Sequence, residues 1–257
     1  MLSLPTLPAN LQANLQGVHE RITKAARAAG RDPSSVRLLA VSKTFEAEAV
    51  VAAARAGQLS FGENYAQEAI AKMDALAGLA PELDIEWHFI GPIQSNKTRV
   101  LAERFDWVQS VDRLKVAERL SEQRPPHMQA LNVLLQVNIS GEASKSGVAP
   151  DELIGMARSV AMLKQLHLRG LMAVPEPTDE VAQQRAAFAT MKRLFEALRE
   201  ALRETLRDRR SAQYAGGVSS IDTLSIGMSS DLDAAIAEGS TMVRVGTAIF
   251  GVRRPRP

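Results

Sequence analysis

Eight short apolar runs alternate with helical patterns along this 257-residue chain, and this alternation limits the fold more than any other feature. The runs cover residues 36–41, 59–61, 86–91, 107–110, 132–137, 168–174, 223–226 and 242–245. Between them, apolar residues recur at three- and four-residue spacing, which indicates amphipathic helices. These helices are expected over residues 11–29, 47–56, 64–77, 96–104, 112–124, 150–163, 179–210, 231–237 and 248–250. Strands that alternate with helices predict a parallel sheet covered by helices.

Eight such units predict a single α/β domain of the (β/α)8 type, the TIM barrel. At this length the chain could form one large α/β domain or two small ones, but no linker and no shift in composition divides it. We therefore expect one barrel domain over residues 11–257, after a flexible lead-in over residues 1–10. The alternative is an open doubly wound sheet, but no Gly-x-Gly-x-x-Gly turn follows the first strand.

The composition excludes several classes of function. The chain has no cysteine, so disulfides, thiolate metal sites and cysteine nucleophiles are absent. A formal net charge of +2 predicts no basic face, which disfavours nucleic acid as a partner. No apolar run approaches the roughly 18 residues of a membrane span, no signal peptide pattern opens the chain, and no acidic or histidine cluster has metal-ligand spacing. We expect a cytoplasmic protein without a metal.

Lys43 closes the first apolar run and is the first candidate for chemistry. Parallel barrels carry their active sites at the C-terminal ends of the strands, which is where this lysine falls. A lysine that loses contact with water has a lowered pKa and becomes a nucleophilic amine. The alternative is a solvated surface charge, the usual state of a lysine. Because the preceding run is continuously apolar, we predict that Lys43 is a Schiff-base lysine.

Two later turns have the composition of a phosphate site. Ser229 and Ser230 follow the seventh strand, and Gly246 and Thr247 follow the eighth. Small residues let backbone N–H groups approach an anion, and barrels usually hold phosphate in the loops after strands seven and eight. Each turn alone could be a tight connection with a serine or threonine cap. Their joint position favours a phosphate site.

A lysine and a phosphate site in one barrel leave two kinds of chemistry open. One is a Schiff-base aldolase acting on a sugar phosphate, and the other is pyridoxal 5'-phosphate bound to the lysine. Arg244 favours the second, because an arginine beside the pyridine nitrogen would keep that nitrogen unprotonated and weaken the ring as an electron sink. Its alternative is an ion pair with a barrel carboxylate.

Other polar residues near strand ends have two interpretations each. His88 is either a hydrogen-bonded core histidine or a catalytic group. Asn64 and Asn138 are either cofactor contacts or turn formers. Lys145 is a loop amine that either binds phosphate or an aldehyde, or simply remains in solvent.

Seven blocks of sequence together resemble the pyridoxal 5'-phosphate homeostasis proteins, a family with an alanine-racemase-like barrel. The blocks are AVSKT at 40–44, FGENY at 61–65, WHFIGPIQSNK at 87–97, QVNISGE at 136–142, GLMAVP at 170–175, LSIGMSSD at 224–231 and GSTMVRVGTAIFG at 239–251. They occur in the order of the family, and the resemblance covers about residues 11–252. Phe45 and Glu46 depart from the usual Lys-Pro of the family, and Ile226 stands where Met is common.

This resemblance implies a fold-type III barrel of the alanine racemase N-terminal-domain kind, with pyridoxal 5'-phosphate as cofactor. Lys43 matches the lysine that forms the aldimine, and Arg244 matches the arginine that faces the pyridine nitrogen. The remaining implied contacts are with the phosphate, from Ser229, Ser230, Gly246 and Thr247, and with the ring, from Asn64 and Met172. No residue is assigned a catalytic role.

The family resemblance also implies a function. Its members are thought to buffer and deliver the cofactor and to balance vitamin B6 and amino-acid pools, without robust turnover. Racemases of this fold use a tyrosine from a separate C-terminal domain, whereas this sequence ends at Pro257 and contains only Tyr65 and Tyr214. We therefore expect a cytoplasmic, monomeric binding protein and not an enzyme, with apo-enzymes that use the cofactor as candidate partners. A racemase-like enzyme is the main alternative, followed by the aldolase.

Overall fold

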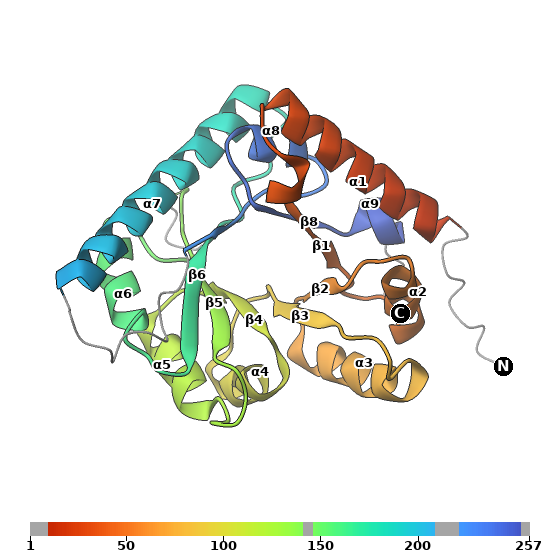
Figure 1. Cartoon of the computed structure of the whole chain (residues 1–257), viewed down its shortest axis with the longest axis horizontal. Helices are drawn as coiled ribbons and strands as arrows, with labels where there is room; N and C mark the ends of the chain where they lie inside the picture. The colour runs from red at the N-terminus through yellow and green to blue at the C-terminus, as the bar shows by residue number, and fades with distance from the viewer. Residues whose placement is uncertain (1–9, 141–145, 209–220, 253–257) are drawn as a thin grey trace.

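Eight parallel strands close into a barrel in the order in which they occur along the chain (Figure 1). The structure, a computed structural model, describes residues 10–140, 146–208 and 221–252. The strands are β1 (Arg37–Val41), β2 (Ser60–Glu63), β3 (Glu86–Phe89), β4 (Trp107–Val111), β5 (Leu131–Gln136), β6 (Leu166–Met172), β7 (Thr223–Ser225) and β8 (Met242–Val245). Pairing of β8 with β1 closes the barrel. The predicted (β/α)8 fold is confirmed.

Helices surround this barrel and cover the outer face of the sheet (Figure 1). They are α1 (Leu11–Ala28), α2 (Ala47–Arg55), α3 (Ala66–Leu79), α4 (Thr98–Arg104), α5 (Leu114–Gln123), α6 (Leu153–Val160), α7 (Val181–Asp208), α8 (Leu232–Ala237) and α9 (Thr247–Phe250). Short 3-10 turns, η1 (Pro33–Ser35) and η2 (Ser95–Lys97), precede β1 and α4. In the described ranges, no helix is long and apolar enough to cross a membrane.

The main core lies between the sheet and the helices. Parallel strands are covered on both faces, which explains why most strand residues are buried and why the runs read as continuously apolar. The long helix α7 contributes a buried stripe at helical spacing, formed by Phe188, Met191, Phe195, Leu198 and Leu202. A second, smaller apolar cluster inside the barrel consists of Trp107, Leu134 and Met172.

The barrel interior also contains buried polar side chains. His88, Gln109, Ser225 and Arg244 are all buried, on β3, β4, β7 and β8. Inward-pointing residues come from alternate positions along each strand, so each of these replaces an apolar residue in the interior layers. Buried polar groups are stable only when they are hydrogen-bonded, and these four are bonded to one another.

The N-terminal helix α1 adds a layer beside the last two units of the barrel. It contacts α8 and α9, next to which it lies in Figure 1. Its apolar stripe, Leu11, Leu15, Val18 and Ile22, is buried. This helix therefore supports the two elements that follow β7 and β8.

Several element boundaries differ from the expected ones. The strand expected over residues 168–174 is β6, Leu166–Met172, and the helix expected over residues 150–163 is α6, Leu153–Val160. The strand expected over residues 59–61 is β2, which runs from Ser60 to Glu63 and leaves Leu59 exposed. Glu63 pairs with Phe89 of β3, and its carboxylate is buried in an ion pair with Lys72. The predicted lead-in over residues 1–10 and the single domain over residues 11–257 stay predictions, since residues 1–9 and 253–257 lie outside the described ranges.

Candidate functional site

Lys43 follows the end of β1 at the C-terminal mouth of the barrel. Its side chain is half-buried, whereas the preceding Ser42 is fully buried. Three hydrogen bonds hold the Ser42 backbone. Its N–H donates to the Gly62 carbonyl at 3.1 Å, and its carbonyl accepts from Lys72 Nζ at 2.8 Å and from the Phe45 N–H at 3.1 Å. The predicted lysine therefore extends from a firmly held strand end.

The chain turns sharply at Thr44, directly after this lysine. Thr44 has a φ of 70°, in the left-handed region that is uncommon for residues other than glycine. Its N–H donates to Glu68 Oε1 on α3. Its Oγ1 is buried and has no hydrogen-bond partner among the described residues. Strain of this kind persists only where the surroundings hold it, so Glu68 helps to fix the direction in which the chain leaves Lys43.

A buried ion pair lies beneath the end of β1. Lys72, on α3, pairs with Glu63, at the end of β2, and their side chains are 3% and 0% exposed. Ser42 Oγ donates to the same carboxylate oxygen of Glu63 at 2.6 Å. Burial raises the pKa of Glu63, although Lys72 and Ser42 act in the opposite direction. This pair was not predicted from the sequence, although a lysine within the apolar stripe of a helix is a signal that could have revealed a buried charge.

The turn between β7 and α8 presents backbone N–H groups to the mouth. Gly227 has a φ of 93°, and a Cβ there would lie 2.4 Å from the Cβ of Ala235, so only glycine fits. Asp231 Oδ1 accepts from the N–H of Met228 at 2.6 Å and fixes the turn. In the part of the chain that the structure describes, the N–H groups of Ser229 and Ser230 donate to no protein atom. These two donors are available to an anion.

The turn between β8 and α9 lies directly beside the strand that carries the lysine. Ala40 of β1 is in register with Val245 of β8. A Cβ on Gly246 would lie 3.1 Å from the Val41 carbonyl oxygen, so the absence of a side chain allows this close approach. Gly246 caps α9, and Thr247, its first residue, is exposed.

Helix α1 ties both turns together from outside the barrel. Arg21 donates to Asp233 Oδ2 from Nε at 3.0 Å and from Nη2 at 2.6 Å, and to the Ser229 carbonyl from Nη1 at 2.6 Å. Asn14 Nδ2 donates to the Ile249 carbonyl at 3.0 Å. The sequence analysis did not identify Arg21, because nothing in its local pattern distinguishes it from other exposed helix residues.

Arg244 is buried inside the barrel near the ends of β6 and β7. Its Nη1 donates to the Ser225 carbonyl at 2.6 Å and to Ser225 Oγ at 2.8 Å, and its Nη2 donates to the Ala173 carbonyl at 2.8 Å. Burial lowers the pKa of Arg244 to about 10, against the opposing charge of Asp231, so the guanidinium stays charged at neutral pH. Among the described residues its hydrogen bonds go to carbonyls and a hydroxyl, which does not match the ion-pair alternative.

The two residues expected beside a cofactor ring occupy different environments. Asn64 follows β2 and is half-buried, and its Oδ1 is buried without a hydrogen-bond partner among the described residues. A Cβ on Gly91 would lie 2.1 Å from the Asn64 carbonyl oxygen, so the loop after β3 packs directly on Asn64. Met172 ends β6 and is almost fully buried in the interior cluster with Trp107.

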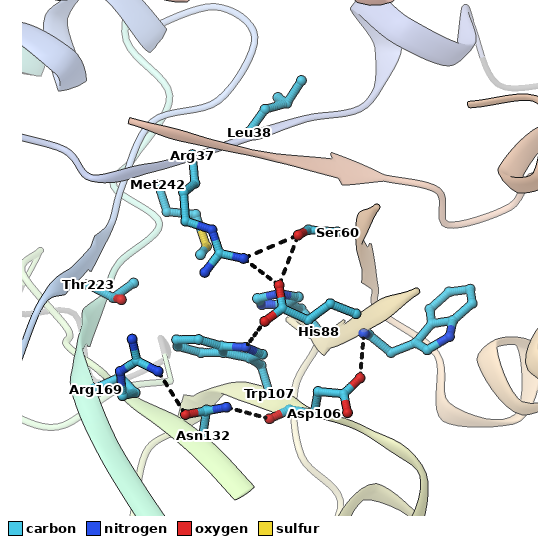
Figure 2. A network of polar contacts seen from close by, with 12 residues as sticks. Arg37, Leu38, Ser60, His88, Asp106, Trp107, Asn132, Arg169, Thr223 and Met242 are labelled. Carbon is cyan, nitrogen blue, oxygen red and sulfur yellow. Dashed lines mark hydrogen bonds and ion pairs between the residues drawn. The ribbon is translucent and has the colours of Figure 1, made fainter. Parts of the chain in front are cut away.

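His88 lies in the barrel interior instead of at the mouth. It is fully buried, its ring stacks on Trp107 with centroids 5.0 Å apart, and Figure 2 shows the two rings together. Its Nδ1 lies 2.9 Å from Gln109 Nε2, and burial lowers the pKa of His88. This environment matches the core-histidine alternative. Expectations for Lys145 and Tyr214 fall outside the described residues.

The structure brings most of the predicted residues to one arc of the mouth. Strands β7, β8, β1 and β2 are consecutive neighbours in the barrel, and their C-terminal ends carry Lys43, Asn64, Ser229, Ser230, Gly246 and Thr247. This arc offers an amine, turns built on glycine and unpaired donors, a set that fits an aldehyde bearing a phosphate. Within the described ranges, no cluster of three or more histidine, aspartate or glutamate residues could hold a metal.

Comparison with known proteins gives consistent relatives. The family described as alanine racemase, N-terminal domain, matches residues 13–254. The pyridoxal phosphate homeostasis protein of Pseudomonas aeruginosa is 56% identical over 93% of this chain and 94% of its own length. Its counterpart from Escherichia coli K12 is 48% identical over 93% and 95%.

Solved structures agree with this assignment. PipY of Synechococcus elongatus, determined with pyridoxal phosphate bound, is 34% identical, with a TM-score of 0.75 over 94% of this chain and all of its own. The alanine racemase of Clostridium difficile shares the fold, with a TM-score of 0.68 and 15% identity over 98% of this chain and 60% of its own. This chain therefore belongs to the family of pyridoxal phosphate homeostasis proteins, which has the fold of the alanine racemase N-terminal domain.

Proposed function

We propose that this protein binds pyridoxal 5'-phosphate through Lys43 and acts in the homeostasis of that cofactor. The observation that carries the proposal is the pairing of β8 with β1, which brings the Gly246 turn against the Val41 carbonyl, two residues before Lys43. An amine and an anion-binding turn on neighbouring strands suit a small aldehyde that carries a phosphate. The cofactor bound in PipY, a relative at 34% identity, supports the same ligand.

Each residue of the arc has a distinct role in this proposal. The Lys43 amine adds to the aldehyde carbon, and loss of water leaves a C=N bond, the Schiff base, with no oxidant or reductant required. The N–H groups of Ser229, Ser230 and Thr247 hold the phosphate, and Gly246 allows the close approach. Asn64, with its unpaired Oδ1, and Met172 line the ring.

Arg244 faces the ring nitrogen and controls its protonation. An arginine has donors only, and with a pKa of about 10 it carries its charge at neutral pH. It can donate to an unprotonated ring nitrogen but not accept from a protonated one. When bound, the cofactor supplies an electron sink, and this arginine weakens it. The proposed role is therefore retention and release of the cofactor without robust turnover.

An amino-acid racemase is the second candidate function, because one observation favours it. Tyr65 directly follows Asn64 after the C-terminal end of β2 and is 53% exposed, so its phenol is accessible to solvent. Racemisation would require two groups that exchange protons on opposite faces of the substrate. Measured racemisation of alanine at rates on the order of 1 per second would favour this enzyme over the binding protein. Rates far below that value support the binding role.

The cellular setting is proposed on general grounds. We infer that the protein acts in the cytoplasm as a monomer and supplies the cofactor to apo-enzymes that need it. The closed barrel buries its own core without a partner, which supports a monomer. The family name of the relatives from Pseudomonas aeruginosa and Escherichia coli supports a role in cofactor supply.

A spectral titration with pyridoxal 5'-phosphate tests the proposed function. The wild-type protein should develop a visible absorption band at equimolar cofactor, and Lys43→Ala should lose it. Lys97→Ala is a matched control, because Lys97 is also half-buried and also follows a strand end of the barrel. It should keep the band. A wild-type protein without the band, or an unchanged band in Lys43→Ala, contradicts the proposal, and the first result would favour the aldolase alternative.

A further inference from the structure

A chain of buried hydrogen bonds crosses the barrel interior and ends at Arg244. Arg244 Nη1 donates to Ser225 Oγ at 2.8 Å, and Ser225 Oγ donates to Gln109 Oε1 at 2.7 Å. Gln109 Nε2 lies 2.9 Å from His88 Nδ1. All four side chains are at most 4% exposed, so water does not compete for these bonds.

The hydrogen bonds of this chain run from Arg244 toward His88. A guanidinium only donates, so Ser225 Oγ accepts from Arg244 Nη1, and Ser225 Oγ in turn donates to Gln109 Oε1. The amide nitrogen of Gln109 therefore faces His88, and Nδ1 of the imidazole must be the acceptor. The second contact of Gln109 Nε2, with Met242 Sδ at 3.2 Å, fits this orientation because sulfur accepts weakly. His88 is therefore the neutral tautomer with its hydrogen on Nε2.

A charged cluster closes the far end of this chain. His88 Nε2 lies 3.1 Å from Glu86 Oε2, although this nitrogen makes no hydrogen bond among the described residues. Glu86 is paired with Arg37 and accepts from Trp107 Nε1 at 2.6 Å and from Ser60 Oγ at 2.9 Å, as Figure 2 shows. The stacked Trp107 ring holds the imidazole plane. His88, the last acceptor in this series of hydrogen bonds, is thus held in place toward the N-terminal end of the barrel.

The donors left on Arg244 lie on one edge of the guanidinium. Both Nη1 hydrogens are used by Ser225, through its carbonyl and its hydroxyl, and one Nη2 hydrogen by the Ala173 carbonyl. The remaining N–H groups are on Nε and Nη2, and they donate to no acceptor among the residues that the structure describes. Ser225 holds this orientation, because rotation of its hydroxyl would break the hydrogen bond from Arg244 Nη1 and allow the guanidinium to turn.

We propose that Ser225, Gln109 and His88 are positioning residues that orient Arg244 toward the ring nitrogen of the cofactor. This role rests on the proposed function. Gln109 prevents rotation of the Ser225 hydroxyl, and His88 prevents a flip of the Gln109 amide, because a flipped amide would set two acceptors against each other. The barrel interior therefore sets the protonation of a ring bound at its mouth.

Two variants and one control test this role. Gln109→Leu removes the amide at similar volume, and Ser225→Ala removes the hydroxyl. Ser110→Ala is the matched control: Ser110 is the buried neighbour of Gln109 on β4, and its Oγ donates to the Gly91 carbonyl at 2.5 Å, outside the chain. Because Ser225→Ala leaves the larger side chains in place, it keeps the test open if Gln109→Leu does not fold.

The first readout uses the protein without cofactor. Nitrogen-15 NMR of the imidazoles should show His88 neutral with its hydrogen on Nε2 in the wild type and in Ser110→Ala. In Gln109→Leu, Nδ1 loses its donor and the two tautomers should mix. A hydrogen on Nδ1 in the wild type contradicts the direction of the chain and overturns the proposal.

The second readout is the pH dependence of the cofactor band. In the wild type and in Ser110→Ala, the band should show no ring-nitrogen protonation near neutral pH. Gln109→Leu and Ser225→Ala should show a new pH-dependent shift and bind the cofactor on the order of tenfold more weakly. Spectra and affinities equal to those of the wild type overturn the positioning role. If the wild-type protein shows no absorption band, the proposed function is wrong. The NMR measurement does not need the cofactor, so it still shows whether the directions of the hydrogen bonds are correct.

Discussion

Two lysines converge on the end of β1, and their surroundings separate their roles. Lys72 is 3% exposed and is held by the Glu63 carboxylate and the Ser42 carbonyl, with Glu68 Oε1 at 3.7 Å. An ammonium held in this way supports the backbone at the end of β1. Lys43 follows the same strand end, is half-buried, and is the amine that we propose for the ligand.

Replacement of Lys72 should therefore destabilise the protein strongly. Lys72→Met leaves the Glu63 carboxylate buried without a countercharge, which costs about 3–5 kcal/mol of unfolding free energy. The double variant Glu63→Gln, Lys72→Met should recover part of that loss. Urea denaturation measures both, and Lys164→Met serves as a control because Lys164 is exposed. A loss below about 1 kcal/mol, the usual value for a surface pair, would show that the pair is not buried in solution.

The candidate site residues could be predicted from the sequence where they belong to a recognisable motif. Lys43, Arg244 and the serine and glycine turns stand in blocks that resemble a family, and the structure brings their strand ends together. Lys72 and Arg21 were missed, because each acts through a partner on another element, Glu63 of β2 for Lys72 and Asp233 of α8 for Arg21. Such contacts arise from packing between elements. The place of Lys72 in the apolar stripe of α3 indicates that it is buried, but it does not identify its partner.

At the scale of elements, the turn after β7 depends on a glycine. Gly227 combines a φ of 93° with a Cβ position 2.4 Å from Ala235, so the turn and α8 can pack only around a glycine. Arg21 on α1 then holds the same turn through the Ser229 carbonyl. The proposed phosphate site is thus fixed from two sides before any ligand binds.

Gly227→Ala should lower both stability and cofactor affinity. Left-handed strain and the overlap with Ala235 together cost about 2–5 kcal/mol of unfolding free energy. Gly155→Ala is the matched control, because Gly155 lies in α6 with open space around it, and alanine there should stabilise the helix by about 0.5–1 kcal/mol. Thermal denaturation and a cofactor titration check both. Equal effects of the two substitutions would be inconsistent with this account of the turn.

The periodicity of the sequence predicted whether each element is a helix or a strand, but it did not predict every residue at which an element begins or ends. The eight expected strands and the helices between them all occur, since each apolar run is covered on both faces. The end of β2 was wrong because Glu63 reads as a polar loop residue, whereas it pairs with Phe89 of β3 and its carboxylate is buried against Lys72. Side-chain partners from another element decide such ends.

At the scale of the whole molecule, the two ends of the barrel differ in character. The C-terminal mouth carries an amine and unpaired backbone donors. The N-terminal end is closed by charged side chains, among them Arg37, Glu86 and Arg169 around the Trp107 ring (Figure 2). Stability and ligand binding are thus separated along the barrel axis, and the chain through Gln109 joins the two ends.

The charged cluster around Glu86, at the N-terminal end of the barrel, should make the stability of the protein depend on pH in the acidic range. Burial acts to raise the pKa of Glu86, but His88, Arg37 and Trp107 together lower it well below its ordinary value of 4.5. A carboxyl with a lowered folded pKa stabilises the protein above its unfolded pKa, and this contribution is lost as the pH falls below about 4.5. Glu86→Gln should be less stable than the wild type at neutral pH and lose less stability in acid.

Thermal denaturation from about pH 7 to pH 3.5 measures this difference. Glu82→Gln is the control, because Glu82 is 59% exposed and its pairing with Arg55 is long at 3.4 Å. It should follow the wild-type curve. Parallel curves for the wild type and Glu86→Gln would contradict the assigned role of the carboxylate.

The most direct test of the central claim is the chemical identity of the residue that holds the cofactor. Borohydride reduction of the protein with bound pyridoxal 5'-phosphate would fix the C=N bond as a stable secondary amine, and peptide mass mapping would locate it. The account predicts a single modified peptide that contains Lys43, and none in Lys43→Ala. Modification at Lys72 or at another lysine, or no modification of the wild-type protein, would contradict it.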